Sequence, residues 1–164
     1  MKVIWVNGLP GSGKTTFSRN LYRFLVNQNK AVVLLDGDDL RRAFNNRFGY
    51  TKQERINLAH IYINLAKLLA EQNSIVIIST VSLFNEVYKR LMQEIPTAKI
   101  VFINAKTDLL DIRNQKSLRT IGAIDSPGIS FEVDFPQDPF LTLRGDETEA
   151  EMFSIFENLS DEIK

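Results

Sequence analysis

The stretch "VNGLPGSGKTT", from Val6 to Thr16, decides the fold. It follows the apolar run "VIWV" (Val3 to Val6) and precedes residues with apolar side chains at helical spacing. The stretch satisfies the pattern G-x-x-x-x-G-K-[ST], in which glycines let successive backbone N–H groups turn onto a phosphate at the start of a helix. A strand, a glycine-rich loop and a helix in this order predict a phosphate-binding loop.

The residues of this loop have separate predicted roles. Lys14 supplies a cation for the β- and γ-phosphates of ATP, and the hydroxyl of Thr15 is a ligand for Mg²⁺. We therefore expect ATP as the co-substrate and Mg²⁺ as the cofactor. The predicted ATP-binding residues of the loop are Gly11, Ser12, Gly13, Lys14, Thr15 and Thr16.

Continuous apolar runs alternate with helical patterns along the rest of the chain. Continuous rather than alternating apolarity is typical of strands buried on both faces of a parallel sheet. The pattern predicts a three-layer α/β/α P-loop NTPase fold with a mainly parallel sheet, in a single domain over residues 1–164. The four runs are Val3–Val6, Ala31–Leu35, Ile75–Ile78 and Ile100–Ile103, and the helical patterns lie within Phe17–Leu25, Ile56–Ala70, Phe84–Ile95 and Met152–Ile163.

Composition narrows the classes of partner and of site. The chain has 164 residues and 44% hydrophobic residues, which suits one globular domain with a core. Lys plus Arg and Asp plus Glu both number 20, so the balance of charge favours neither a nucleic acid nor an acidic membrane as partner. The chain has no cysteine, which excludes disulfides and thiolate metal sites. The apolar run near the N-terminus is too short for a signal sequence or a membrane span, and we expect a cytoplasmic protein.

Three carboxylates and two guanidinium groups follow the second apolar run, in "LLDGDDLRR" (Leu34 to Arg42). Asp36 and Asp38 alternate around Gly37, so in an extended turn both would face the γ-phosphate. One would orient Mg²⁺ and the other would accept the proton of an incoming hydroxyl, while Arg41 would hold an anionic group of the acceptor. The alternative is a polar strand-to-helix loop with Asp38 or Asp39 as the helix N-cap. The predicted catalytic residues are Lys14, Asp36 and Asp38, and the predicted metal ligands are Thr15 and Asp36.

Other classes of P-loop protein fit less well. A GTPase needs N-K-x-D after a late strand, and "AKTD" (Ala105 to Asp108) lacks the Asn. A motor ATPase usually has an acidic residue at the end of its third strand, where this chain has Ser79 and Thr80. A regulatory nucleotide-binding module without turnover would keep the loop but has no need of Asp36 and its neighbouring charges together. These comparisons favour a small-molecule kinase.

At these residues the chain resembles the adenylylsulfate kinase family, whose members transfer the γ-phosphoryl group of ATP to the 3′-hydroxyl of adenosine 5′-phosphosulfate. The family's G-L-x-G-S-G-K-[ST]-T is matched from Gly8 to Thr16. Its D-G-D-N-[VIL]-R is matched from Asp36 to Arg41, with Asp39 in place of Asn. The resemblance covers nearly the whole chain and implies the same fold and the same type of reaction.

The resemblance also implies a set of acceptor-binding and lid residues. Tyr50 takes the place of a Phe that stacks on the acceptor base. The family's I-S-P after the third strand keeps only its Ser, and R-D-x-K-G-L-Y appears as "RNQKSLR". In the latter motif the Arg lies on the ATP adenine and the Lys belongs to a lid, which we expect at about residues 114–130. The implied ATP contact is Arg113, and the implied acceptor-binding residues are Asp38, Arg41, Tyr50, Arg55, Ser82, Lys116, Leu118 and Ile121.

The acceptor-reading residues depart from the family more than the phosphate loop does. Ile121 replaces a Phe that covers the second face of the acceptor adenine, and Leu58 replaces an Asn that contacts the acceptor. An aromatic stacking contact with a base is worth roughly 1–3 kcal/mol. We therefore expect ATP-dependent phosphorylation of a ribose hydroxyl on a small nucleotide, with adenosine 5′-phosphosulfate as the family default. A smaller nucleotide, such as the cytidine diphosphoramidate of capsule modification, is the alternative. The family is often dimeric, so a homodimer is an expectation from the resemblance alone.

Overall fold

The computed structural model describes residues 1–106 and 132–163. Its strands form one five-stranded sheet in the order β2-β3-β1-β4-β5, and every pair of neighbouring strands is parallel. This confirms the predicted α/β fold with a mainly parallel sheet. The strands are β1 Lys2–Gly8, β2 Val32–Asp36, β3 Ile75–Thr80, β4 Lys99–Ile103 and β5 Leu141–Leu143, and the helices are α1 Lys14–Asn27, α2 Gly37–Ala43, α3 Lys52–Glu71, α4 Asn85–Glu94 and α6 Glu149–Glu162.

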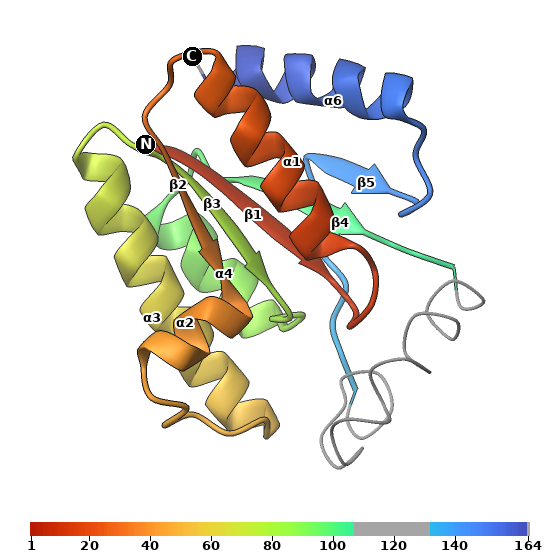
Figure 1. Cartoon of the computed structure of the whole chain (residues 1–164). Helices are drawn as coiled ribbons and strands as arrows, with labels where there is room; N and C mark the ends of the chain where they lie inside the picture. The colour runs from red at the N-terminus through yellow and green to blue at the C-terminus, as the bar shows by residue number, and fades with distance from the viewer. Residues whose placement is uncertain (107–131, 164) are drawn as a thin grey trace.

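Helices cover both faces of the sheet (Figure 1). On one face, Val3 and Trp5 of β1 belong to a core cluster with α3 and α4. On the other face, Ile4 and Val6 pack with α1 and α6. Both sets are fully buried, because successive side chains of a strand point to opposite faces of a sheet that is covered on each side. This explains why the apolar runs are continuous.

Two long helices begin with the same reciprocal N-terminal cap. The Thr51 hydroxyl accepts from the backbone N–H of Glu54 at the start of α3, and the Glu54 side chain accepts from the Thr51 N–H. Thr148 and Glu151 repeat the arrangement at the start of α6. These capping boxes fix where α3 and α6 begin.

Among the described residues, no helix combines the length and the apolar character needed to cross a lipid bilayer.

The parallel register gathers the carboxyl ends of the strands at one edge of the sheet. β1 ends at Gly8 and continues into the phosphate loop, β2 ends at Asp36, and β3 ends at Thr80. Asp36 lies opposite Ser79 in the pairing of β2 with β3. Ligands of open α/β sheets bind outside this edge, so the candidate site residues are brought together by the topology.

The strand β5 was not predicted from the sequence. β5 has only three residues, "LTL", and they form no continuous apolar run. It exists because Leu141–Leu143 pairs in parallel with Val101–Ile103 of β4 at the edge of the sheet. The short strand places the following residues beside the phosphate loop, where they line the pocket described below.

Candidate phosphotransfer site

The phosphate loop has the backbone that its glycines allow. Gly11 and Gly13 have φ angles of 79° and 100°, in the left-handed region that other residues adopt only with strain. A Cβ atom on Gly8 would lie 2.5 Å from the Ser12 Oγ and 2.6 Å from the Ile103 carbonyl oxygen. The loop therefore closes tightly against the end of β4, and α1 begins at Lys14 directly after it.

Lys14 is the central cation of the loop. Its side chain is 8% exposed, and its Nζ donates to the Leu9 carbonyl oxygen at 2.7 Å and to the Ser12 Oγ at 3.5 Å. Burial lowers its pKa to about 8, although the nearby Asp38 and Asp36 carboxylates act in the opposite direction. The ammonium group is thus held by neutral acceptors inside the loop, where the oxygens of a phosphate are better partners.

Thr15 and Asp36 meet at the mouth of the loop. The Thr15 hydroxyl donates to the Asp36 Oδ2 at 2.9 Å. A hydroxyl and a carboxylate are the hard oxygen donors that Mg²⁺ prefers. In the described part of the chain, no group of three or more His, Cys, Asp and Glu side chains could hold a metal ion. These two residues therefore suit Mg²⁺ only together with oxygens from phosphate and water.

The segment after Asp36 corrects the extended turn expected from the sequence. Gly37 begins α2, and Asp36 is its N-cap, because the Asp36 Oδ1 accepts from the Asp38 backbone N–H at 3.0 Å. The cap is thus Asp36, and neither Asp38 nor Asp39 has that role. Asp36 is 5% exposed whereas Asp38 is exposed, so the two carboxylates lie in different environments. A local hydrogen bond to a helix start outweighs the extended conformation that the alternating pattern suggested.

Arg41, Tyr50 and Arg55, three of the predicted acceptor-binding residues, form a cluster. The Arg41 guanidinium carbon lies 4.5 Å from the centre of the Tyr50 ring, and that of Arg55 lies 5.2 Å from it. Arg41 Nη1 donates to the carbonyl oxygens of Phe48 and Gly49, at 2.8 and 2.7 Å. Arg55 Nε donates to the Tyr50 carbonyl oxygen at 2.8 Å. Tyr50 is 44% exposed, so the cluster offers an accessible ring beside two cations.

Tyr62 of α3 is a residue of this site that sequence reasoning missed. Its side chain is 2% exposed, and its hydroxyl donates at 3.2 Å to the carbonyl oxygen of Gly37, between the two aspartates. Burial raises the pKa of Tyr62, so its hydroxyl stays protonated and can donate. In the sequence the residue is one apolar position among many in α3, and no local signal distinguishes it.

Two other predicted positions lie inside the molecule. Ser82 is 1% exposed, and its hydroxyl lies 3.3 Å from the side chain of Asn7. Leu58 is 1% exposed and belongs to the core under α3 and α4. Four further predicted residues, together with the lid expected at about 114–130, lie outside the described residues. They are Arg113, Lys116, Leu118 and Ile121.

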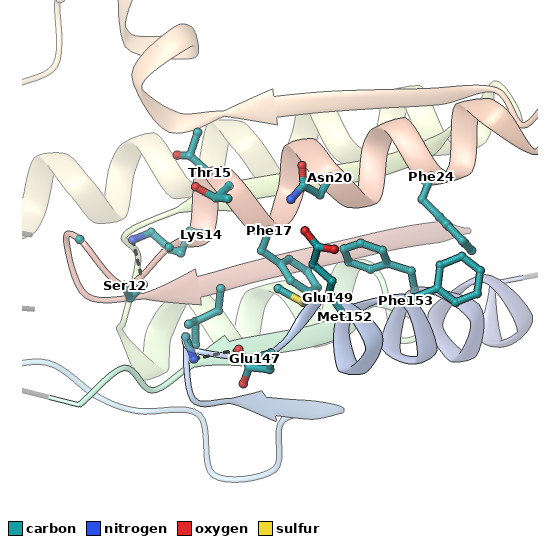
Figure 2. Close-up of a pocket in the computed structure, with 16 residues that line it drawn as sticks. Ser12, Lys14, Thr15, Phe17, Asn20, Phe24, Glu147, Glu149, Met152 and Phe153 are labelled. Atoms are coloured by element: carbon teal, nitrogen blue, oxygen red, sulfur yellow. Dashed lines mark hydrogen bonds between the residues drawn. The ribbon is translucent and has the colours of Figure 1, made fainter. Parts of the chain in front are cut away.

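A pocket of about 760 Å³ opens on the other side of the phosphate loop, between α1 and α6. Figure 2 shows Lys14 and Thr15 at one end of it and Phe24 and Phe153 at the other, with Glu149 between them. The pocket has the size of a small-molecule site and combines apolar walls with a few polar groups. It is lined by residues 11–17, Asn20, Phe24, Ile103, Gly145, Glu147, Glu149, Met152, Phe153 and Phe156.

The loop after β5 is built into the wall of this pocket. Gly145 has a φ of 80°, and a Cβ atom there would lie 2.9 Å from the Ser12 carbonyl oxygen. The Glu147 Oε2 accepts from the Gly145 N–H at 3.0 Å, and Arg144 pairs with Glu151 at 3.0 Å. These bonds fix the shape of the loop after β5, and its Gly145 packs closely against Ser12 of the phosphate loop.

The comparison with known families agrees with this geometry. The model of the adenylylsulphate kinase family matches residues 1–144. The chain belongs to the adenylylsulfate kinase family. A cytidine diphosphoramidate kinase of Campylobacter jejuni is 36% identical over 139 residues, which cover 82% of this chain and 81% of that protein. An adenylyl-sulfate kinase of Deinococcus deserti is 32% identical over 149 residues, covering 88% and 82%.

A solved structure supports the fold of this adenylylsulfate kinase family member. The Mycobacterium tuberculosis APS kinase in complex with AMPPNP and APS superposes with a TM-score of 0.86 at 24% identity, covering 98% of this chain and 96% of its own length. Because its family and these relatives are kinases that use an alcohol group as phosphoryl acceptor, the chain is a kinase of this class. The resemblance drawn from the sequence motifs is confirmed.

Proposed function

We propose that this kinase transfers the γ-phosphoryl group of ATP to a ribose hydroxyl, the 3′-hydroxyl in the family reaction, of a small nucleotide with a negatively charged 5′ group. Adenosine 5′-phosphosulfate is the first acceptor to test. The contact of Thr15 with Asp36 carries the proposal, because it joins the metal-binding hydroxyl of the phosphate loop to a carboxylate of the acceptor side at 2.9 Å. A regulatory module has no need of that junction.

The chemistry follows from the position of each charge. The acceptor oxygen attacks the γ-phosphorus, the bond from phosphorus to the β–γ bridging oxygen breaks, and ADP leaves. Lys14 stabilises negative charge on the transferred group. Asp38 is the exposed carboxylate of the aspartate pair, and we assign to it the proton of the attacking hydroxyl. Thr15 and Asp36 would hold Mg²⁺ together with the phosphates, and the ion would supply further positive charge there.

The two sides of the loop divide donor from acceptor. The pocket between α1 and α6 continues directly from the phosphate loop, so we assign it to the nucleoside of ATP. Arg41, Arg55 and Tyr50 lie on the side of α2 and α3, so we assign them to the acceptor's anionic group and base. Two guanidinium groups beside one exposed ring fit a nucleotide with a charged 5′ substituent.

The second candidate acceptor is cytidine diphosphoramidate, because the Campylobacter jejuni relative is a cytidine diphosphoramidate kinase. One exposed aromatic ring, Tyr50, stacks on a purine or a pyrimidine equally well. The test measures kcat/KM with ATP for both acceptors, in native protein and in Tyr50→Ala. We expect transfer to at least one acceptor and an acceptor KM about tenfold higher in the variant, with the ATP KM unchanged. ATP binding without transfer to either acceptor would favour the regulatory module instead.

Three further parts of the proposal concern the metal ion, the cellular location and the assembly of the protein. We propose that the reaction needs Mg²⁺, that the protein works in the cytoplasm, and that it forms a homodimer. Chelation of Mg²⁺ by EDTA should abolish transfer, and excess Mg²⁺ should restore it. Sedimentation of the purified protein would distinguish a dimer of the 18.7 kDa chain from a monomer.

A further inference from the structure

Asn7 is the last residue before Gly8 and the phosphate loop, and its side chain is completely buried. Five polar groups surround its amide, and one of them is the Ser82 backbone N–H at 3.4 Å. The indole Nε1 of Trp5 lies at 2.9 Å and the carbonyl oxygen of Thr80 at 3.0 Å. The Tyr88 hydroxyl lies 3.4 Å from one end of the amide, and the Ser82 hydroxyl lies 3.3 Å from the other.

The chemistry of these neighbours fixes which way the amide points. An indole N–H can only donate, so the amide oxygen of Asn7 faces Trp5 and accepts from it. A carbonyl oxygen can only accept, so the amide NH₂ faces Thr80 and donates to it. Burial raises the pKa of the Tyr88 hydroxyl, which keeps its proton and can donate to the oxygen end. The oxygen end of the amide thus meets two donors, and its NH₂ end meets two acceptors, the Thr80 carbonyl and the Ser82 hydroxyl. The Ser82 backbone N–H also lies 3.4 Å from the NH₂ end.

The amide joins the donor side of the site to the acceptor side. Thr80 ends β3, and a Cβ atom on Gly37 would lie 3.6 Å from the Thr80 Oγ1. Thr80 therefore packs beside the turn that carries Asp36 and Asp38. Ser82 follows two residues later and is almost fully buried, with its hydroxyl turned towards Asn7.

The same segment is held from its outer side by the chain that returns before β5. The Asp134 backbone N–H donates to the Leu83 carbonyl oxygen at 2.9 Å, and the Asp134 Oδ2 accepts from the Asn85 N–H at 2.9 Å. Asn7 contacts this segment on its buried side, and Asp134 contacts it on its outer side. Together these contacts fix the position of residues 80–85. A buried amide with partners at both ends is the element that specifies that position, because any shift would leave a buried polar group unpaired.

We propose that Asn7 is a positioning residue of the acceptor site, which fixes the segment from Thr80 to Ser82 relative to the phosphate loop. The inference rests on the proposed function, because it assigns this edge of the sheet to the acceptor. Asn7 touches neither phosphate nor acceptor in this role. It acts through Thr80, which backs the aspartate turn, and through Ser82, which the family resemblance places against the acceptor.

The first variant is Asn7→Leu, which keeps the branching of the side chain at Cγ, enlarges it and removes all the amide contacts. We expect the acceptor KM to rise about tenfold, since a displaced binding segment loses alignment. The Kd of ATP should stay within twofold, because the backbone of the phosphate loop and the Lys14 contacts remain. A loss of fold in general would instead weaken ATP and acceptor binding together.

The matched control is Ser18→Ala. Ser18 is also fully buried and lies in α1 next to the phosphate loop, but its hydroxyl has no hydrogen-bond partner among the described residues. Removing the Ser18 hydroxyl should change neither the acceptor KM nor the Kd of ATP. If Asn7→Leu does not fold, Tyr88→Phe decides, because it removes one contact at the far end of the amide. A smaller rise of the acceptor KM supports the proposal, and no change overturns it.

Trp5 provides a readout that does not depend on turnover. It is the only tryptophan of the chain, and its N–H donates to Asn7. Its emission should shift in Asn7→Leu and should respond to adenosine 5′-phosphosulfate in native protein. Equal losses for ATP and acceptor, or no change in a folded Asn7→Leu, would overturn the positioning role. If native protein binds the acceptor but transfers nothing, the proposed function fails while the Asn7 comparison stands on binding affinity. If it binds no acceptor, both are overturned.

Discussion

The buried ammonium group of Lys14 should make ATP binding depend on pH in a range where few other groups titrate. Burial lowers the pKa of Lys14 to about 8 in the free protein. The phosphates of ATP bring several negative charges to its Nζ, which raises that pKa in the complex. The complex therefore binds more protons than the free protein above pH 8. By linkage, ATP affinity is full below the free-state pKa and is lost as the pH rises through it.

The magnitude of the effect follows from the lowered pKa of Lys14. At pH 7 about nine-tenths of Lys14 carries its charge in the free protein, and at pH 9 about one-tenth does, for a pKa near 8. The Kd of ATP should rise about tenfold between pH 7 and pH 9, equivalent to about 1.4 kcal/mol. The terminal phosphate of ATP loses its last proton near pH 6, so it contributes little to this window. His60 stays neutral there, because burial lowers its pKa below 6.5.

Titration calorimetry at constant Mg²⁺ measures the effect in two ways. The Kd at pH 7, 8 and 9 gives the affinity profile. Repeating the titration at pH 8.5 in two buffers of different ionisation enthalpy counts protons, and we expect uptake of about 0.75 proton per ATP. Lys14→Arg is the control, because a guanidinium stays charged throughout and should remove the pH dependence. A flat Kd from pH 7 to pH 9 without proton uptake would refute the reasoning.

Three substitutions test other parts of the site. Asp36→Asn should keep its ATP affinity within a few-fold but lose on the order of 100-fold in kcat, since an amide is a poor metal ligand. An unchanged kcat in steady-state assays would show that Asp36 is only a helix cap. Tyr62→Phe removes the bond to Gly37 and should lower kcat roughly 5- to 10-fold without changing the ATP Kd, whereas equal effects on both would contradict a role confined to the aspartate turn. Gly8→Ala should lose roughly 1–3 kcal/mol in denaturant unfolding, because its Cβ would meet the Ile103 carbonyl oxygen at 2.6 Å, and native stability would show that the loop can relax.

Sequence alone determined the phosphate loop and the strands β1 to β4 of this protein. The phosphate loop depends on glycines at fixed spacing, and Gly11 and Gly13 show the left-handed backbone that the pattern demands. The four apolar runs correspond to β1 to β4, because a strand buried on both faces needs no alternation. These are local requirements of the backbone and of burial, and they can be read from a few consecutive residues.

Tertiary structure decided what surrounds that loop. The three residues of β5 are a strand only because β4 lies beside them. Asp36 became a helix cap through a bond to Asp38 that competes with the extended turn. Asn7 shares its amide between Trp5, two positions away, and residues more than seventy positions away, such as Thr80, so no periodicity in the sequence could reveal it. Contacts between distant segments depend on which faces the fold brings together, and this is the part of the site that the sequence pattern leaves undetermined.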